Sequence, residues 1–81
     1  MKFMEIEVRA YSGCRLNERP LSFRLRGQVH EVAEIVDRWY EGRPEPGSPY
    51  RNYFKVRTAG GKEFLLRYNG LFDAWSVMIY D

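Results

Sequence analysis

Apolar and polar residues alternate in several short segments of this chain, and this alternation restricts its possible folds more than any other feature. Successive side chains of a strand point to opposite faces, so a period of two predicts strands with one buried face. Dipeptides typical of hairpin turns, Gly60-Gly61 and Asn69-Gly70, separate some of these segments. The pattern predicts strands at residues 2–10, 21–26, 50–58, 62–68 and 75–80.

Short strands joined by tight turns indicate an all-β, mainly antiparallel fold. The chain has 81 residues, near the lower end for a self-sufficient core, and its aromatic content of 16% supplies large rings to fill that core. We expect a small, strongly bent sheet or a partly open SH3-like barrel, because such a sheet buries one face and limits free edges. The residues expected to face the core are Met4, Ile6, Val8, Phe23, Leu25, Phe54, Val56, Thr58, Phe64, Leu66, Tyr68, Trp75, Val77 and Ile79.

Residues 29–41 fit two different structures. At 100° per residue the apolar side chains fall in one arc and the charged ones in the other, which is typical of an amphipathic helix. Against a helix, no capping residue precedes Val29, and the segment is rich in β-branched and aromatic residues. A long bent strand with a bulge near Glu34–Ile35 also reconciles the two faces. An α+β fold with one helix at 29–41 therefore stays the alternative.

The Gly27-Gln28 dipeptide predicts a two-residue type II′ turn, because that turn places glycine at its first central position. Counting back from this turn pairs Arg24 with Glu31 on the outer face of the hairpin. An opposite-charge pair across two strands contributes about 0.2–1 kcal/mol to stability.

Cysteine and histidine are scarce, which limits covalent and metal chemistry. Cys14 is the only cysteine, so no internal disulfide forms, and with one histidine the chain lacks the about four ligands of a structural zinc site. No signal peptide or long apolar run is visible, so we expect one cytoplasmic domain at 1–81 with no metal, cofactor or membrane contact. Residues 42–49, GRPEPGSP, contain three prolines and two glycines and predict an exposed loop.

The segments DRWYEG, YFKVR and LLRY resemble a bacterial family of small cytoplasmic domains of unknown function. Some members of that family are attached to Y-family-DNA-polymerase-like proteins, which implies a link to DNA repair or replication. The resemblance carries over no catalytic or ligand residues. In such relatives the position of His30 is often aromatic, and a large ring is misplaced in the polar arc of a helix. The resemblance therefore favours a strand for residues 29–36.

Five cations and one aromatic residue are expected to point away from the core. Such a surface binds a nucleic-acid backbone through its cations and stacks a base on the ring. Alternatively, the cations pair with glutamates of neighbouring strands, and a net charge of +2 is only a weak indication of nucleic-acid binding. The candidate nucleic-acid-binding residues are Arg24, Arg26, Tyr53, Lys55, Arg57 and Arg67.

Aromatic residues in and after the DRWYEG segment form a second candidate site. Trp39, Tyr40 and Tyr50 are typical of a face that binds a peptide or a second copy of the chain. The alternative places Trp39 and Trp75 in the core, because a chain of this size needs its largest rings inside.

No set of nucleophile, base and oxyanion-binding groups can be assembled from this sequence, so we expect a chain without catalytic activity. The leading hypothesis is a protein–protein interaction module, which includes a homodimer formed through a free strand edge or through the aromatic residues. The alternative is a nucleic-acid-binding accessory module linked to DNA repair or replication. Contacts through aromatic rings survive raised salt, whereas phosphate binding does not, so salt dependence separates the two.

Overall fold

The computed structural model describes residues 2–11, 19–42 and 51–79, which form six strands and no helix. The strands are β1 (Lys2–Tyr11), β2 (Arg19–Leu25), β3 (Gln28–Glu41), β4 (Arg51–Thr58), β5 (Glu63–Asn69) and β6 (Ala74–Ile79). The prediction of an all-β fold is confirmed. The alternative with a helix at 29–41 is wrong, because these residues belong to the long strand β3.

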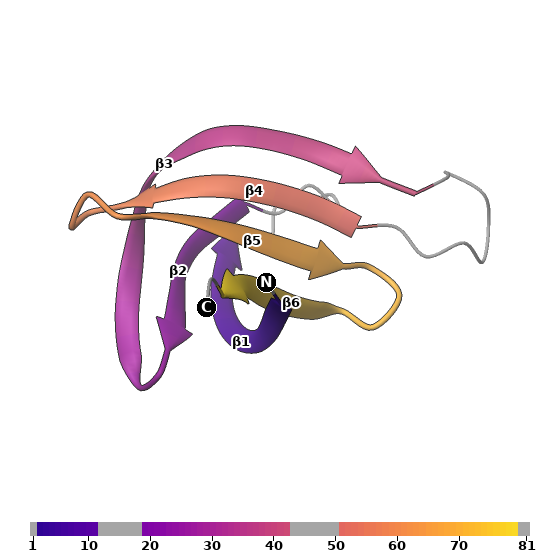
Figure 1. Cartoon of the computed structure of the whole chain (residues 1–81), viewed down its shortest axis with the longest axis horizontal. Helices are drawn as coiled ribbons and strands as arrows, with labels where there is room; N and C mark the ends of the chain where they lie inside the picture. Colours follow the sequence, from indigo (N-terminus) through magenta and orange to yellow (C-terminus); the bar gives the residue numbers. More distant parts are fainter. Residues whose placement is uncertain (1, 12–18, 43–50, 80–81) are drawn as a thin grey trace.

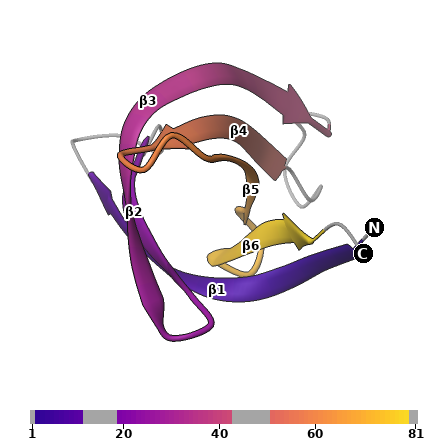
Figure 2. The same cartoon turned by 60° about the vertical axis from the view of Figure 1, so that its left-hand side comes forward.

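The six strands close into a barrel in which all pairings are antiparallel (Figures 1 and 2). Each strand pairs with the next one in the chain, and β6 pairs with β1 to close the barrel. Residues 2–6 of β1 pair with β6, and residues 7–11 of the same strand pair with β2. In β3, residues 28–31 pair with β2 and the rest pair with β4. Because these two long strands change partner midway, the sheet bends back on itself. The expected small, strongly bent SH3-like barrel is confirmed, but the barrel is closed, whereas we expected a bent sheet or a partly open barrel.

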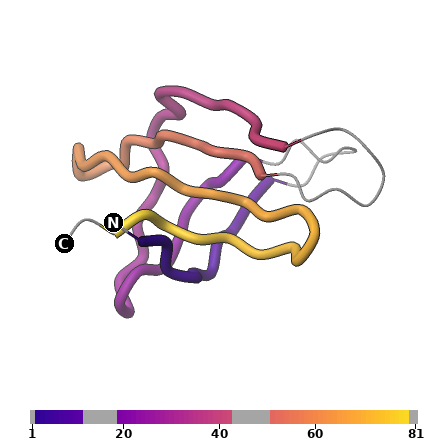
Figure 3. Tube along the Cα trace, turned by 45° about the vertical axis from the view of Figure 1, so that its right-hand side comes forward, coloured from indigo at the N-terminus to yellow at the C-terminus, as the bar shows by residue number. Residues whose placement is uncertain are grey.

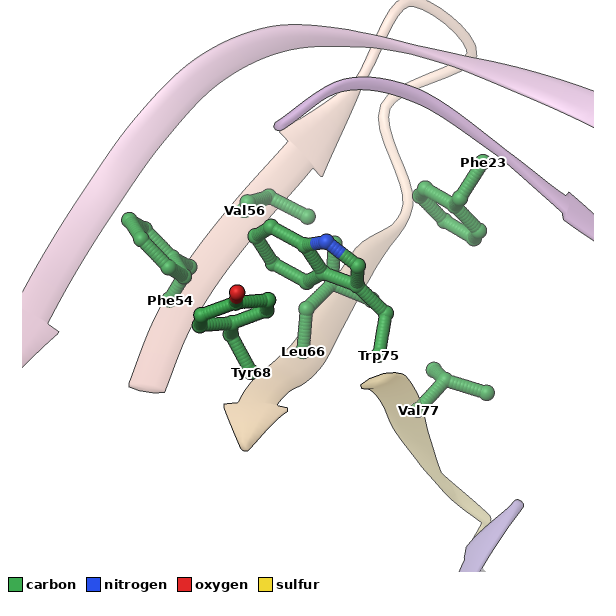
Figure 4. Packing of buried hydrophobic residues seen from close by; sticks show 7 residues of the cluster. All are labelled: Phe23, Phe54, Val56, Leu66, Tyr68, Trp75 and Val77. Carbon is green, nitrogen blue, oxygen red and sulfur yellow. The ribbon is translucent and has the colours of Figure 1, made fainter. Parts of the chain in front are cut away.

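The core of the barrel is a cluster of large apolar side chains that alternate along β4, β5 and β6 (Figure 4). Fully burying a side chain such as Leu66, which is 0% exposed, contributes about 1.5–3 kcal/mol. The apolar residues of β1, Met4, Ile6 and Val8, pack against this cluster. The buried members are Phe23, Phe54, Val56, Leu66, Tyr68, Trp75 and Val77, all of which the alternation assigned to the core.

Bulges in β3 explain why its sequence also fits a helix. Its pairing with β4 shifts register between Val32 and Glu34 and again between Ile35 and Asp37. Val32, Ile35 and Arg38 therefore lie opposite buried residues of β4, at a spacing of three instead of two. A spacing of three is close to the helical period of 3.6, so the apolar pattern suits both structures. We expected one bulge near Glu34–Ile35, and the structure has two bulges there, one on each side of this pair.

The turn between β2 and β3 differs from the prediction by one residue. Leu25 pairs with Gln28, so the central residues of the turn are Arg26 and Gly27, with φ of 52° and 80°. Two positive φ angles are typical of a type I′ turn, whose twist matches that of the flanking strands. The predicted type II′ turn at Gly27-Gln28 is wrong.

The observed register has a physical cause in the packing of His30. It pairs His30 with Phe23, and the two rings stack with centroids 5.2 Å apart and an interplanar angle of 19°. The His30 ring also lies 5.3 Å from the ring of Phe64. In this register Arg24 pairs with Val29, two residues before Glu31 on the same face of β3, so the predicted cross-strand pair of Arg24 and Glu31 is absent.

Several predictions concern residues that the structure does not describe. Gly42 is exposed with a φ of 115°, but the rest of the expected loop at 42–49 lies outside the described residues. Cys14 and Tyr50 also lie outside them. The described residues contain no helix that is long and apolar enough to span a membrane.

Candidate functional site

The outer surface of β3, β4 and β5 carries a cluster of aromatic side chains. Trp39 pairs with Tyr53, which in turn pairs with Arg67 on the next strand. Successive side chains of a strand point to opposite faces, and Phe54 points into the core. Tyr53 and its two partners therefore lie outside the barrel, where Phe3 of β1 joins them. We call Phe3, Trp39, Tyr53 and Arg67 the outer aromatic face.

The four side chains of the outer aromatic face contact one another in sequence. The rings of Trp39 and Tyr53 are parallel within 6°, with centroids 5.3 Å apart. Phe3 meets Tyr53 edge-on at 6.2 Å, and the guanidinium carbon of Arg67 lies 3.8 Å from the centre of the Phe3 ring. Tyr53 is 9% exposed as a result, whereas Trp39 remains 40% exposed. Trp39 is thus the ring of this cluster that offers a large free surface.

The two tryptophans occupy different environments. Trp75 is 8% exposed and lies in the core, with ring centroids 5.0 Å from Tyr68 and 5.5 Å from Phe54 (Figure 4). The interpretation of Trp75 as a core residue is therefore confirmed. The same interpretation is wrong for Trp39, because the bulge at Ile35 leaves Arg38 facing inward and turns Trp39 outward.

Charged side chains border the outer aromatic face in two columns of opposite sign. The columns are Glu34, Asp37 and Glu41 on β3, opposite Arg57, Lys55 and Arg51 on β4. Glu41 also accepts hydrogen bonds from Arg51 Nη1 and from the hydroxyl of Tyr53, both at 3.2 Å. The ring of Tyr53 is therefore tied to the acidic column, and carboxylates lie on both sides of Trp39 along β3.

Arg57 is held between two carboxylates. Its Nη1 pairs with Glu34 and its Nη2 lies 2.8 Å from an oxygen of Glu63. The hydrogen bond with Glu63 and the negative charge of Glu34 raise the pKa of Arg57. Lys55 Nζ lies 3.8 Å from the other oxygen of Glu63. Two of the proposed phosphate-binding cations thus pair with carboxylates of neighbouring strands.

The predicted nucleic-acid surface is divided between two parts of the barrel. Arg24 and Arg26 line a shallow depression together with Glu5 and Glu7 of β1. β2 pairs with neither β4 nor β5, so no continuous basic stripe joins the two parts of the described surface. The other four predicted residues do lie together, and they are Tyr53, Lys55, Arg57 and Arg67.

The predicted partner-binding residues do not form one surface either. Tyr40 is 58% exposed, but it lies opposite the buried Asn52, on the other side of β3 from Trp39. Its hydroxyl accepts a hydrogen bond from Arg38 Nη2 at 3.1 Å. Tyr50, the third member, lies outside the described residues.

The second half of β3 lies at the margin of the sheet (Figure 1). Of the strands that the structure describes, only β4 pairs with residues 32–41. Exposed strand margins attract further strands, and proteins discourage this with bulges and inward-pointing charges. β3 has both, since it contains two bulges and its Arg38 guanidinium lies 4.9 Å from the centre of the Phe54 ring. The margin is therefore poorly suited to strand addition.

Sequence reasoning missed Phe3, a member of the outer aromatic face, and Leu65, which lies beside that face. Both are apolar residues in the polar phase of their strands, next to the core-facing Met4 and Leu66 respectively. Leu65 lines a shallow depression together with Trp39. Apolar residues out of phase with the core, on strands that are otherwise alternating, are the sequence signal that could have identified an external apolar surface.

Comparisons with known proteins leave the function to be inferred from this geometry. No protein-family model matches the chain, and no curated protein and no solved structure matches it. The resemblance to the bacterial family of small cytoplasmic domains stays a prediction. Among the described residues, no group of three or more His, Cys, Asp and Glu side chains is placed to hold a metal ion.

Proposed function

We propose that this chain is a non-catalytic protein–protein interaction module that binds its partner through the outer aromatic face. The observation that carries this proposal is the environment of Trp39. Its ring is 40% exposed on the outside of the barrel and is held flat against Tyr53. Trp, Tyr and Arg are the residue types that dominate binding energy at protein interfaces, and a ring already fixed by stacking loses little freedom on binding.

The charges around Trp39 favour a protein partner over a nucleic acid. Glu34, Asp37 and Glu41 follow the strand that carries Trp39, and phosphates lying along that strand would meet their negative charges. The cations on the next strand are largely neutralised, since Arg57 pairs with two glutamates and Arg51 with one. An aromatic centre with charges of both signs around it resembles the polar rim of a protein interface.

The outer aromatic face supports this function better than the margin of β3 does. A partner that added a strand to β3 would have to follow two bulges, which disrupt the regular spacing of backbone groups. The face needs no such adjustment, because its rings already contact one another in the free chain.

Site-specific photo-crosslinking in the native cell tests the proposal. We would incorporate p-benzoylphenylalanine in place of Leu65, which lines the depression beside Trp39, and in place of Lys62, an exposed residue in the β4–β5 turn, as the control position. The proposal expects an adduct from position 65 that nuclease leaves intact and protease removes. Adding Trp39→Ala should reduce that adduct by about tenfold, the loss typical of removing an interface tryptophan.

Three results would count against the proposal. A nuclease-sensitive adduct at position 65 would assign the face to nucleic acid, as in an accessory module of DNA repair or replication. Equal adducts at positions 65 and 62 would mean unspecific contact. No adduct at position 65 would mean that the face has no partner in the cell.

A further inference from the structure

The turn between β5 and β6 presents two large apolar side chains to solvent. Leu71 is 57% exposed and Phe72 is 73% exposed. Hairpin turns usually carry small or polar residues, and two adjacent apolar residues at such a position cannot contribute much to the core. Their exposure therefore calls for a role outside the barrel.

This turn is held in one shape by its own hydrogen bonds. The side-chain oxygen of Asn69 accepts hydrogen bonds from the backbone N–H groups of Leu71 at 3.0 Å and Phe72 at 3.4 Å. At the other end, the hydroxyl of Tyr68 donates a hydrogen bond to Asp73 at 2.6 Å. The backbone that carries the two apolar residues is thus already ordered in the free chain, which lowers the entropy lost on binding.

The turn lies next to the outer aromatic face. Tyr53 and Arg67 are paired across β4 and β5, and the pair Arg51 and Asn69 is two residues further along, next on the same face, where the turn begins. The turn is also at the same end of the barrel as the end of β3 and the start of β4 (Figures 1 and 3). A single partner can therefore reach both features.

The outer aromatic face is smaller than a typical protein interface, so a partner bound there must also contact the surface beside it. Strands lie about 4.8 Å apart and rise about 3.3 Å per residue, so three strands over eight residues span a projected area of roughly 380 Å². A specific protein interface buries about 800 Å² on each partner. The face alone is well below this area, and the adjacent turn extends it with Phe72, the most exposed large hydrophobic residue in the described part of the chain.

We propose that Leu71 and Phe72 form a preorganised anchor that enters an apolar pocket of the protein bound at the outer aromatic face. This inference rests on the proposed function and adds that the partner carries an apolar pocket. The pocket that receives the anchor is apolar and belongs to a protein. Residues 69–73 contain one acid, Asp73, and no cation to attract anionic lipid headgroups, and Arg51 opposite Asn69 is paired with Glu41.

A second copy of this chain is a poorer partner for the anchor than a protein with an apolar pocket. Shallow depressions on its described surface are rimmed by charged side chains, such as Lys55 and Glu63 beside Trp39 and Glu7 and Arg24 beside Val29. An apolar ring that entered such a depression would separate these charges from water without pairing with them.

Photo-crosslinking from the turn separates this inference from the proposed function. With p-benzoylphenylalanine in place of Leu71, we expect an adduct with the same protein that is trapped from position 65. An adduct from position 65 without one from position 71 would overturn the anchor and leave the proposed function standing. If neither position gives a protein adduct, both fail. An adduct at position 71 with twice the mass of the chain, or binding to phosphatidylglycerol vesicles lost in Phe72→Ser, would also overturn the anchor.

Titration against the protein trapped in this way tests the energetic part of the inference. Phe72→Ser and Leu71→Ser should each weaken binding by about tenfold, because each removes a side chain that fills the pocket. Val29→Ser removes an apolar residue of similar exposure, 52%, beside the β2–β3 turn and should leave affinity unchanged. Asn69→Ala keeps both apolar side chains but loosens the turn, so it should weaken binding by about threefold. Equal affinity of Phe72→Ser and Val29→Ser would overturn the anchor.

Discussion

Neighbouring residues of this chain have opposite roles, according to the face of the strand that they occupy. Tyr53 and Phe54 are adjacent on β4, yet Phe54 lies in the core and Tyr53 lies outside, covered by Trp39 and Phe3. Alternation predicted the side of both residues. It did not predict that Tyr53 would be almost as inaccessible as Phe54, because that depends on side chains from other strands.

The two tryptophans should differ in their contribution to stability. Trp75→Ala should lower the free energy of unfolding by about 3–5 kcal/mol, because it leaves a cavity in the core. Trp39→Ala should lower it by about 0.5–1.5 kcal/mol, the value of one ring stack. Urea unfolding followed by tyrosine fluorescence measures both. A loss for Trp39→Ala as large as for Trp75→Ala would place Trp39 among the core residues and contradict the proposed function.

At the scale of elements, the turns and β3 mark the limits of sequence reasoning. The strands of the β4–β5 hairpin and its turn at Gly60-Gly61 follow from local signals alone. The β2–β3 turn does not, because the stacking of His30 on Phe23 favours a register in which Arg26 has a positive φ. The helical appearance of residues 29–41 likewise disappears only when the pairing of β3 with β4 shows its two bulges.

The β2–β3 turn offers a test of this register. Gly27→Ala should destabilise the chain by about 1–2 kcal/mol, because Gly27 has a φ of 80° and a left-handed backbone is unfavourable for residues with a Cβ. No atom lies within 4 Å of the added Cβ, so the effect isolates the backbone conformation.

Gly60→Ala is the matched control for that test. Its added Cβ would lie 3.9 Å from Thr58 Oγ1, an ordinary contact, and its φ is outside the left-handed range. Stability should therefore stay the same or rise by up to about 1 kcal/mol. Equal effects of the two substitutions in thermal unfolding would contradict a positive φ at Gly27.

At the scale of the whole molecule, the distribution of charge matters more than its sum. The chain has 13 basic and 11 acidic residues, and the structure places several of each in contact on the outside of β3, β4 and β5. Arg24 and Arg26 lie on another part of the barrel. A net charge of +2 therefore does not produce one strongly basic surface on the described part of the chain.

Binding to single-stranded nucleic acid should be weak for the same reason. A labelled oligonucleotide titrated with the chain should show affinity only at low salt and none detectable near 0.15 M, where the screening length is about 8 Å. Arg67→Ala and Arg24→Ala should have similar small effects, since Arg24 lies on another part of the barrel and the cations near Arg67 are paired with carboxylates. Affinity that persists at 0.15 M salt, with a marked loss in Arg67→Ala alone, would favour the nucleic-acid alternative.

The sequence by itself determined five of the strands and their inward faces, because alternation and turn dipeptides are local properties of the chain. It left residues 29–41 open between a strand and a helix, and β3 was decided by its pairing with β4. Tertiary structure decided the rest. The partner change within β1 and β3 closes the barrel, the bulges turn Trp39 outward, and contacts between distant strands assemble Phe3, Tyr53 and Arg67 into one surface. The physical reason is that a side chain's face follows from its own strand, whereas its neighbours on that face come from strands far away in sequence.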